Sequence, residues 1–181
     1  MRCYTFGNFY FSSIQQGIQA AHSQMELFNK YIPHNFNDNR VADIPQIDML
    51  WDWSNNHKTT ICLNGGMNSD LENIKDFFSR EDNPYPWSAF YESEEAMAGI
   101  LSNVCIVLPE RIYALSSLLK RFRYSIPNIE DMSVEDVDYA FDTIVLDLKD
   151  KLSYEPIEEF GRYSKVEISI AQFMGNYSLA K

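Results

Sequence analysis

The first third of the chain alternates a short apolar run with a segment of helical periodicity. Residues 3–11 are rich in aromatic side chains and predict a strand. Ser12 and Ser13 supply N-cap hydroxyls ahead of apolar residues at helical spacing, which are Ile14, Ile18, Ala21, Met25 and Phe28. The spacing predicts a first helix over about residues 13–31. The polar residues 33–42 predict a loop.

The middle of the chain predicts further strands separated by helices. Apolar positions between residues 44 and 53 indicate a second helix that ends near residues 55–56. Residues 58–63 are β-branched and apolar and predict a strand, which Gly65 and Gly66 end. Ser69-x-x-Glu72 has the form of a capping box and predicts a helix through Phe78. Two more strands are expected, with a charged turn of helix between them, over residues 87–91 and 101–108.

The last third of the chain is predicted to be mainly helical. Pro109 suits the start of a helix that reaches Arg123. Ser133-x-x-Asp136 predicts a cap for a helix running to about residue 152, with its apolar side chains on one stripe and its acids mostly on the other face. Ser164-x-x-Glu167 predicts the cap of a final helix, although the alternation in that stretch is also compatible with a strand.

This order of elements predicts a layered α/β fold whose sheet is covered by helices on both faces. In such sheets, ligands bind at strand ends against the N-terminus of a helix. The junction at residues 11–17 is therefore the prime candidate site, and Ser12, Ser13, Gln15 and Gln16 are the groups that would hold a phosphate or carboxylate. A role for the same serines as helix caps alone fits the sequence equally well, because capping and anion binding use the same groups.

Charge is unevenly distributed over the 181 residues, whose formal net charge is −11. Residues 126–160 hold eleven Asp or Glu against two Lys, a net charge of −9, whereas residues 1–125 carry −4. This balance argues against bulk binding of nucleic acid, which needs clustered Lys and Arg. The acidic helix over residues 133–151 is interpreted as a solvated face or, alternatively, as a docking surface for a host protein or a mimic of nucleic acid.

Cysteine and histidine spacing predicts neither a metal site nor a cofactor. Cys3, Cys62 and Cys105 each lie in an apolar run and are expected to be reduced core thiols. No apolar run approaches the length of a membrane span and the N-terminus lacks a signal-peptide pattern, so we expect a soluble, cytoplasmic protein. Among the three histidines, His22 falls on the apolar face of the first helix and fits a core residue better than a catalyst.

The order of elements resembles that of the type II peptidyl-tRNA hydrolases. The resemblance begins with Gln19-Ala20-Ala21-His22 in the first helix after a strand and continues through Leu50-Trp51-Asp52-Trp53 and the later strands to about residue 112. It implies a three-layer α/β/α core over residues 1–112, with a four-stranded mixed sheet, and a helical extension over residues 113–181. The aromatic content of 14% and the apolar helices are also compatible with a homodimer.

The catalytic pattern of that family is only partly present. Its members carry lysine in the turn before the first helix, where this chain has no basic residue. His22 matches the family pattern, and Glu92 stands where the family has Asp. An active hydrolase would therefore use His22 and Glu92 as its acid–base groups. A second resemblance, of residues 4–22 and 55–66, is to proteins of large tailed bacteriophages, which implies a location in the host cytoplasm.

These observations support three functional hypotheses. The first is a non-catalytic protein that binds a small anionic ligand such as a linear or cyclic nucleotide, and thereby sequesters a host defence signal. Besides the junction, it would use Gln19, the basic and hydroxyl groups of Lys58, Thr59 and Thr60, and an aromatic wall from Trp87 or Tyr91. The second hypothesis is an active peptidyl-tRNA hydrolase. The third is a docking module that inhibits a host factor.

Overall fold

Four strands form a mixed sheet in the computed structural model, which describes residues 1–32, 45–151 and 162–180. They are β1 (Arg2–Gly7), β2 (Thr60–Asn64), β3 (Trp87–Tyr91) and β4 (Leu101–Leu108). Their order across the sheet is β2-β1-β4-β3, with β1 parallel to β2 and the other two pairs antiparallel. The predicted four-stranded mixed sheet is confirmed. The predicted loop at residues 33–42 lies outside the described residues.

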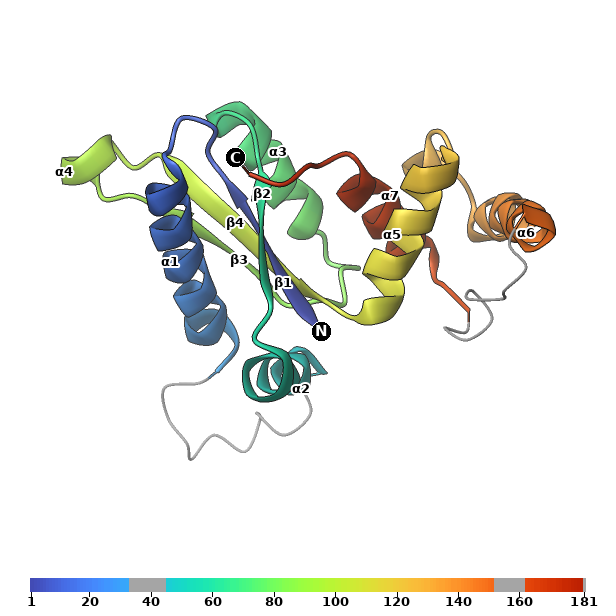
Figure 1. Cartoon of the computed structure of the whole chain (residues 1–181), viewed down its shortest axis with the longest axis horizontal. Coiled ribbons are helices and arrows are strands. Elements are labelled where there is room, and N and C mark those ends of the chain that lie inside the picture. The colour runs from blue at the N-terminus through green and yellow to red at the C-terminus, as the bar shows by residue number, and fades with distance from the viewer. Residues whose placement is uncertain (33–44, 152–161, 181) are drawn as a thin grey trace. The chain divides into compact units, whose positions relative to one another are not determined.

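Helices α1 (Ser13–Tyr31) and α3 (Asn68–Phe78) cover opposite faces of this sheet (Figure 1). Strand β4 is buried along its whole length, as expected for a strand with both faces covered. Its Cys105 thiol lies against the Ser23 carbonyl of α1 at 3.3 Å. On the other face, the ring of Phe6 in β1 packs on Phe78 of α3 at 5.7 Å between centroids. The three-layer α/β/α arrangement is therefore confirmed.

Helix α2 (Pro45–Asp52) closes the core on the α1 side of the sheet. It continues into a π-helical turn, Trp53–His57, where the indole Nε1 of Trp53 donates to the Thr59 carbonyl at 3.0 Å. The core cluster on this side consists of Cys3, Leu27, Leu50, Trp53, Cys105 and Val107. The following strand begins at Thr60 rather than at residue 58, because Lys58 has a left-handed backbone (φ 53°) that ends the helical turn.

Helix α3 begins two residues earlier than its predicted capping box implies. The carboxylate of Asp70 accepts a hydrogen bond from the backbone N–H of Met67 at 2.8 Å, which places the N-cap at Met67. Ser69 consequently lies inside the first turn, so the predicted capping box of Ser69 and Glu72 is wrong. Two caps later in the chain are confirmed: Ser133 accepts from the Asp136 N–H at 3.1 Å, and Ser164 and Glu167 form the reciprocal box.

The apolar stripe of α1 faces solvent, contrary to the expectation for a core helix. Ile14, Ile18 and Met25 are 76%, 49% and 60% exposed. The buried face of the helix consists of Gln16, Ala20, Ser23 and Leu27. This reversal has a physical cause in the sheet, which presents small and polar side chains to α1.

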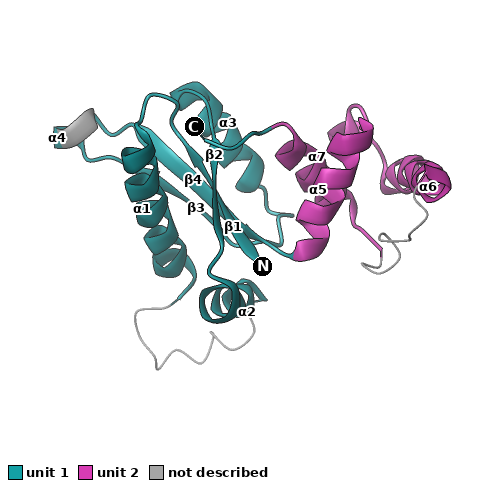
Figure 2. Ribbon diagram, viewed as in Figure 1, with its two compact units in different colours: residues 1–109, 177–181 teal, residues 110–176 magenta. Residues whose placement is uncertain are grey.

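The remaining helices form a second compact unit, residues 110–176, while residues 177–181 belong with residues 1–109 in the first (Figure 2). The second unit contains α5 (Glu110–Phe122), a 3-10 turn (Ile129–Asp131), α6 (Val134–Lys151) and α7 (Lys165–Gly175). The predicted boundary at residue 112 lies close to the Pro109–Glu110 junction between the units. A short helix of the first unit, α4 (Glu94–Met97), joins β3 to β4.

Packing in the second unit centres on Arg111 of α5. Its guanidinium lies 3.1 Å from the Glu167 carboxylate of α7 and 4.6 Å from the centre of the Tyr163 ring. Burial raises the pKa of Tyr163 to about 12. The final helix is confirmed, with Ile168, Ile170, Ala171 and Met174 buried. In neither unit does a described helix have the length and apolar character needed to cross a membrane.

Candidate functional site

A pocket of about 270 Å³ lies at the C-terminal ends of the parallel strands β1 and β2. It is lined by Phe9, Phe11, Gln16, Asn64, Ser178, Leu179 and Ala180. Asn64 is the last residue of β2, and Phe9 follows β1 by two residues. The carboxyl edge of parallel strands is where open α/β sheets place their ligands.

Close backbone packing builds the floor of the pocket. The N–H of Phe9 donates to the Gly66 carbonyl at 2.7 Å, and the N–H of Gly65 donates to the Gly7 carbonyl at 2.9 Å. A Cβ atom at Gly7 would lie 1.5 Å from Oε1 of Gln16, so a larger residue there would displace the Gln16 amide. Gly66 has a φ of +83°, which L side chains rarely adopt. These glycines allow the loops after β1 and β2 to approach each other.

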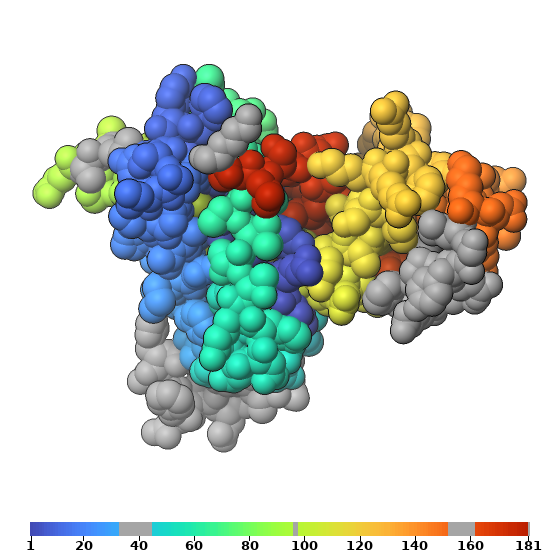
Figure 3. Space-filling model, viewed as in Figure 1, coloured from blue at the N-terminus to red at the C-terminus, as the bar shows by residue number. Residues whose placement is uncertain are grey.

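The C-terminal segment forms another wall of the pocket. It runs antiparallel to β2: the Asn64 N–H donates to the Ser178 carbonyl, and the Ala180 N–H donates to the Cys62 carbonyl, both at 3.0 Å. The ring of Tyr177 packs edge-on against Phe6 at 4.9 Å, and burial raises the pKa of Tyr177 to about 12. Figure 3 shows these red-coloured residues lying against the green segment that contains β2.

Two amide side chains and the Ser178 hydroxyl supply the polar side-chain groups of the pocket. Gln16 is buried and donates from Nε2 to the Asn8 carbonyl at 2.6 Å, while Oδ1 of Asn64 accepts from the Gly66 N–H at 3.0 Å. Within the described ranges, Oε1 of Gln16 and Nδ2 of Asn64 make no hydrogen bond. The lining thus offers one free acceptor and one free donor, together with the rings of Phe9 and Phe11.

The first turn of α1 lies beside this pocket, because Phe11 and Gln16 flank it. Ser12 and Gln15 are occupied with each other: the Ser12 N–H donates to Oε1 of Gln15 at 2.9 Å, and the Ser12 hydroxyl accepts from the Gln15 N–H. This box satisfies two of the four N–H groups that a helix start leaves free. The N–H groups of Ser13 and Ile14 remain outside the helical ladder.

Lys58, Thr59 and Thr60 lie at the far end of β2 from the pocket. Thr60 pairs with Cys3 at the start of β1, whereas Asn64 pairs with Gly7 at its end. Four residues of strand separate the two positions, about 13 Å. The Thr59 carbonyl already accepts from the Cys3 N–H and from Trp53, and the Thr60 hydroxyl accepts from Gln24. The structure therefore does not bring these three residues to the junction at Ser12.

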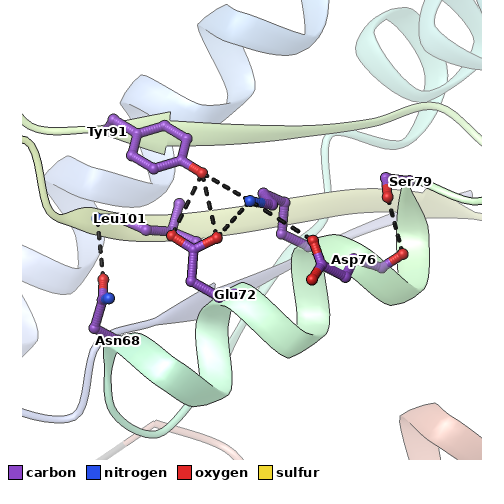
Figure 4. A network of polar contacts seen from close by, with 7 residues as sticks. Asn68, Glu72, Asp76, Ser79, Tyr91 and Leu101 are labelled. Atoms are coloured by element: carbon purple, nitrogen blue, oxygen red, sulfur yellow. Dashed lines mark hydrogen bonds and ion pairs between the residues drawn. The ribbon is translucent and has the colours of Figure 1, made fainter.

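Trp87 and Tyr91 also lie outside the pocket. The ammonium of Lys30 sits 3.4 Å from the centre of the Trp87 ring, and burial lowers the pKa of Lys30 to about 8. Tyr91 lies on the other face of the sheet, where its hydroxyl meets Glu72 and the ammonium of Lys75 on α3 (Figure 4). Hydrogen bonds from Lys75 to Glu72 and Tyr91 raise the pKa of Lys75. The aromatic wall of the pocket consists instead of Phe9 and Phe11.

The predicted acid–base residues are separate. His22 is exposed, and its ring stacks on Phe90 with 4.6 Å between centroids, so the prediction of a core histidine is wrong. Oε1 of Glu92 is buried and has no hydrogen-bond partner among the described residues. None of the contacts found in the described parts of the chain joins His22 to Glu92. Gln19, a predicted ligand residue on α1, accepts a 3.4 Å hydrogen bond from the Ser102 hydroxyl of β4.

No group of three or more His, Cys, Asp or Glu side chains in the described ranges is placed to hold a metal ion. Cys3 and Cys105 are buried free thiols, and Cys62 is half-buried. Burial raises the pKa of the Cys3 thiol. These cysteines belong to the core or its edge rather than to the pocket.

In comparisons with known proteins, no protein-family model matches this chain, and no curated protein matches it significantly. The resemblances to type II peptidyl-tRNA hydrolases and to phage proteins stay predictions.

Most of the pocket could not be found from sequence. Of the residues that line it, only Gln16 was a predicted ligand residue, although Ser12, Ser13 and Gln15 adjoin it in the first turn of α1. A signal for Phe9 and Phe11 existed in the aromatic run before α1, and Gly65-Gly66 marks the second loop. The C-terminal wall forms because residues 178–180 pair with β2, and no local sequence pattern predicts that pairing.

Proposed function

We propose that this chain binds a small anionic ligand of the nucleotide class in the pocket at the ends of β1 and β2, without transforming it. The observation that carries the proposal is the combination of free amide groups, two phenyl rings and a helix start around one cavity. Each part matches a different part of a nucleotide. Among the described residues that line the cavity none is basic, so backbone N–H groups would supply the anion contacts.

The base would lie against Phe9 and Phe11, since aromatic rings stack on bases without strong preference among them. Gln16 and Asn64 would pair with its polar edge, because a free carbonyl and a free amide N–H complement the alternating donors and acceptors of a base. The phosphate would contact the N–H groups of Ser13 and Ile14, where the helix dipole favours negative charge.

Size narrows the ligand further. The cavity of about 270 Å³ is slightly smaller than the usual range for small-molecule pockets. It suits the base and sugar of a mononucleotide, whose phosphate would remain at the rim. If the chain is phage-encoded, as its resemblance suggests, the corresponding role would be to sequester a host signalling nucleotide.

The test is calorimetric titration of the full chain with AMP, cyclic AMP and GMP, with adenosine as the probe without phosphate. Asn64→Asp preserves the acceptor for the Gly66 N–H and replaces the free donor by a negative oxygen. We expect it to weaken nucleotide binding about 10- to 100-fold, the loss typical of a hydrogen bond involving a charged group.

Asn73→Asp is the matched control, because Asn73 is exposed on α3 outside the pocket and the variant adds the same charge. It should bind like the wild type. Failure of the wild type to bind any of the nucleotides, or equal losses in both variants, would contradict the proposal. The alternative of a hydrolase is tested separately by peptide release from peptidyl-tRNA, with His22→Ala as the variant.

A second candidate function, protein docking, is favoured by the outer face of α6. Tyr139 and Leu146 are 78% and 65% exposed. They lie about two helical turns apart, on the side of α6 opposite its buried residues. Glu135, Asp142 and Asp150 flank them, and all three are exposed. Within the described ranges these three acids form no ion pair. An apolar strip bordered by unpaired acids fits a basic amphipathic helix.

This second function is tested with a designed amphipathic helical peptide of leucine and lysine and a scrambled peptide of the same composition. The chain should bind the amphipathic peptide, and binding should weaken as salt rises. The double substitution Tyr139→Ala and Leu146→Ala keeps every charge and should weaken binding at least tenfold. Equal binding of the scrambled peptide, or no loss in the double variant, would show that only bulk charge is involved.

A further inference from the structure

The solvent-facing side of α1 is an apolar surface that the described residues leave uncovered. Ile14, Ile18 and Met25 are 76%, 49% and 60% exposed, and Ala21 between them is exposed as well. They lie directly opposite the buried residues Gln16, Ala20, Ser23 and Leu27 on the helix. Single exposed apolar residues are ordinary, but an aligned series over three turns marks an interaction surface.

Two further features of α1 indicate that another helix packs on this face. Gly17 stands in the interior of the helix, where glycine costs about 1 kcal/mol relative to alanine, and a Cβ there would have no neighbour within 4 Å. No contact with the described part of the chain therefore requires glycine at this position. Gly17 and Ala21 lie one turn apart on one side of the stripe and allow a second backbone to approach closely.

The stripe carries no charge. Between residues 13 and 31 the formally charged side chains are Glu26 and Lys30. The Lys30 ammonium is directed to the Trp87 carbonyl and ring. This surface therefore does not select a partner by charge complementarity. An equally uncharged apolar helix is required.

We propose that α1 pairs with α1 of a second copy of this chain, antiparallel about a two-fold axis. The stripe consists of Ile14, Ile18, Ala21 and Met25, which are spaced four, three and four residues apart, so the spacing is the same read from either end. In an antiparallel pair with its axis between residues 19 and 20, Ile14 meets Met25 of the other copy and Ile18 meets Ala21. Large side chains thus pack against small or flexible ones in an isologous contact.

The available area is sufficient for such a dimer. Phe9 and Tyr10 immediately precede α1 and are 60% and 73% exposed. Together with Ile14, Ile18 and Met25 they present roughly 700 Å² of accessible surface per copy, close to the area of about 800 Å² per partner that specific interfaces bury. Because Phe9 also lines the pocket, the interface would lie next to the ligand site. The dimer does not depend on that site being occupied.

The proposal is tested by sedimentation equilibrium of the full chain over a range of micromolar concentrations. We expect a monomer–dimer equilibrium in the wild type. Ile18→Glu and Met25→Glu should each weaken association at least tenfold, because each would bury a carboxylate at the contact. Both positions are exposed in the single chain, so circular dichroism and melting should show that the variants remain folded.

Val134→Glu is the matched control, since it places the same charge on an exposed apolar position of α6. It should associate like the wild type. The antiparallel arrangement is tested by mixing Ile14→Cys with Met25→Cys chains and adding a short thiol-reactive cross-linker. The mixture should yield more covalent dimer than either variant alone.

A wild type that stays monomeric throughout, or a dimer that survives both α1 substitutions and dissociates with Val134→Glu, would overturn the proposal. Cross-linking of Met25→Cys alone at the same yield as the mixture would overturn the antiparallel arrangement.

Discussion

Individual polar residues, rather than apolar ones, distinguish the interface between α1 and the sheet. The hydroxyl of Ser23 donates to Oδ1 of Asn103 at 2.7 Å, and that of Ser88 donates to the Ser23 carbonyl at 2.5 Å. Thr5 is fully buried, and its Oγ1 forms no hydrogen bond with any residue that the structure describes. A buried hydroxyl without a partner carries an uncompensated desolvation cost.

Replacing Thr5 by valine should therefore stabilise the protein. Valine has nearly the same shape and lacks the unsatisfied hydroxyl, so we expect the free energy of unfolding to rise by about 1 kcal/mol. Thr5→Ser keeps the hydroxyl, removes a buried methyl group and should lower it by about 1 kcal/mol. Urea denaturation of both variants measures the difference. Loss of stability in Thr5→Val would show that the hydroxyl has a partner, such as a buried water.

Helix α1 shows why a hydrophobic pattern can give the right element with the wrong orientation. The spacing of Ile14, Ile18 and Met25 correctly predicted a helix over residues 13–31. It could not show that the sheet beneath presents Gly7, Ser88 and Asn103, since these residues come from three strands. A face with Gln16 and Ser23 complements those groups, so the apolar stripe turns outward. The same reversal explains why His22 was misplaced in the core.

The π-helical turn before β2 gives a test of one predicted ligand residue. Lys58 has φ 53°, a conformation that costs a non-glycine residue about 1 kcal/mol. Lys58→Gly should therefore raise the free energy of unfolding by up to about 1 kcal/mol in urea denaturation, less the entropy that glycine gains in the unfolded chain.

The same variant should leave nucleotide affinity unchanged, because Lys58 lies at the opposite end of β2 from the pocket. Lys58→Ala is the companion variant: it also removes the ammonium, but it keeps the backbone strain. A fall in affinity in both variants would restore Lys58 to the binding site and contradict the placement of the ligand at the ends of β1 and β2.

At the scale of the whole chain, the order of the elements could be predicted and the assembly of the site could not. Alternating strands and helices indicated helices on both sheet faces, and the pattern located β2, β3 and β4 to within about two residues. The first strand was predicted too long: it ends at Gly7, four residues before the predicted end at residue 11. The general position of the site, beside the start of α1, was also accessible. Its composition was not, because Asn64 and residues 178–180 reach Gln16 only through sheet register and the return of the C-terminus.

The central claim is that a nucleotide binds at the ends of β1 and β2, and a residue-resolved NMR titration of the full chain with AMP tests it most directly. We predict that the side-chain amide signals of Gln16 and Asn64 shift, together with the backbone amides of Phe9, Phe11 and residues 178–180. Shifts confined to Lys58, Thr59, Thr60 and Trp87, or no shifts at saturating AMP, would contradict the account.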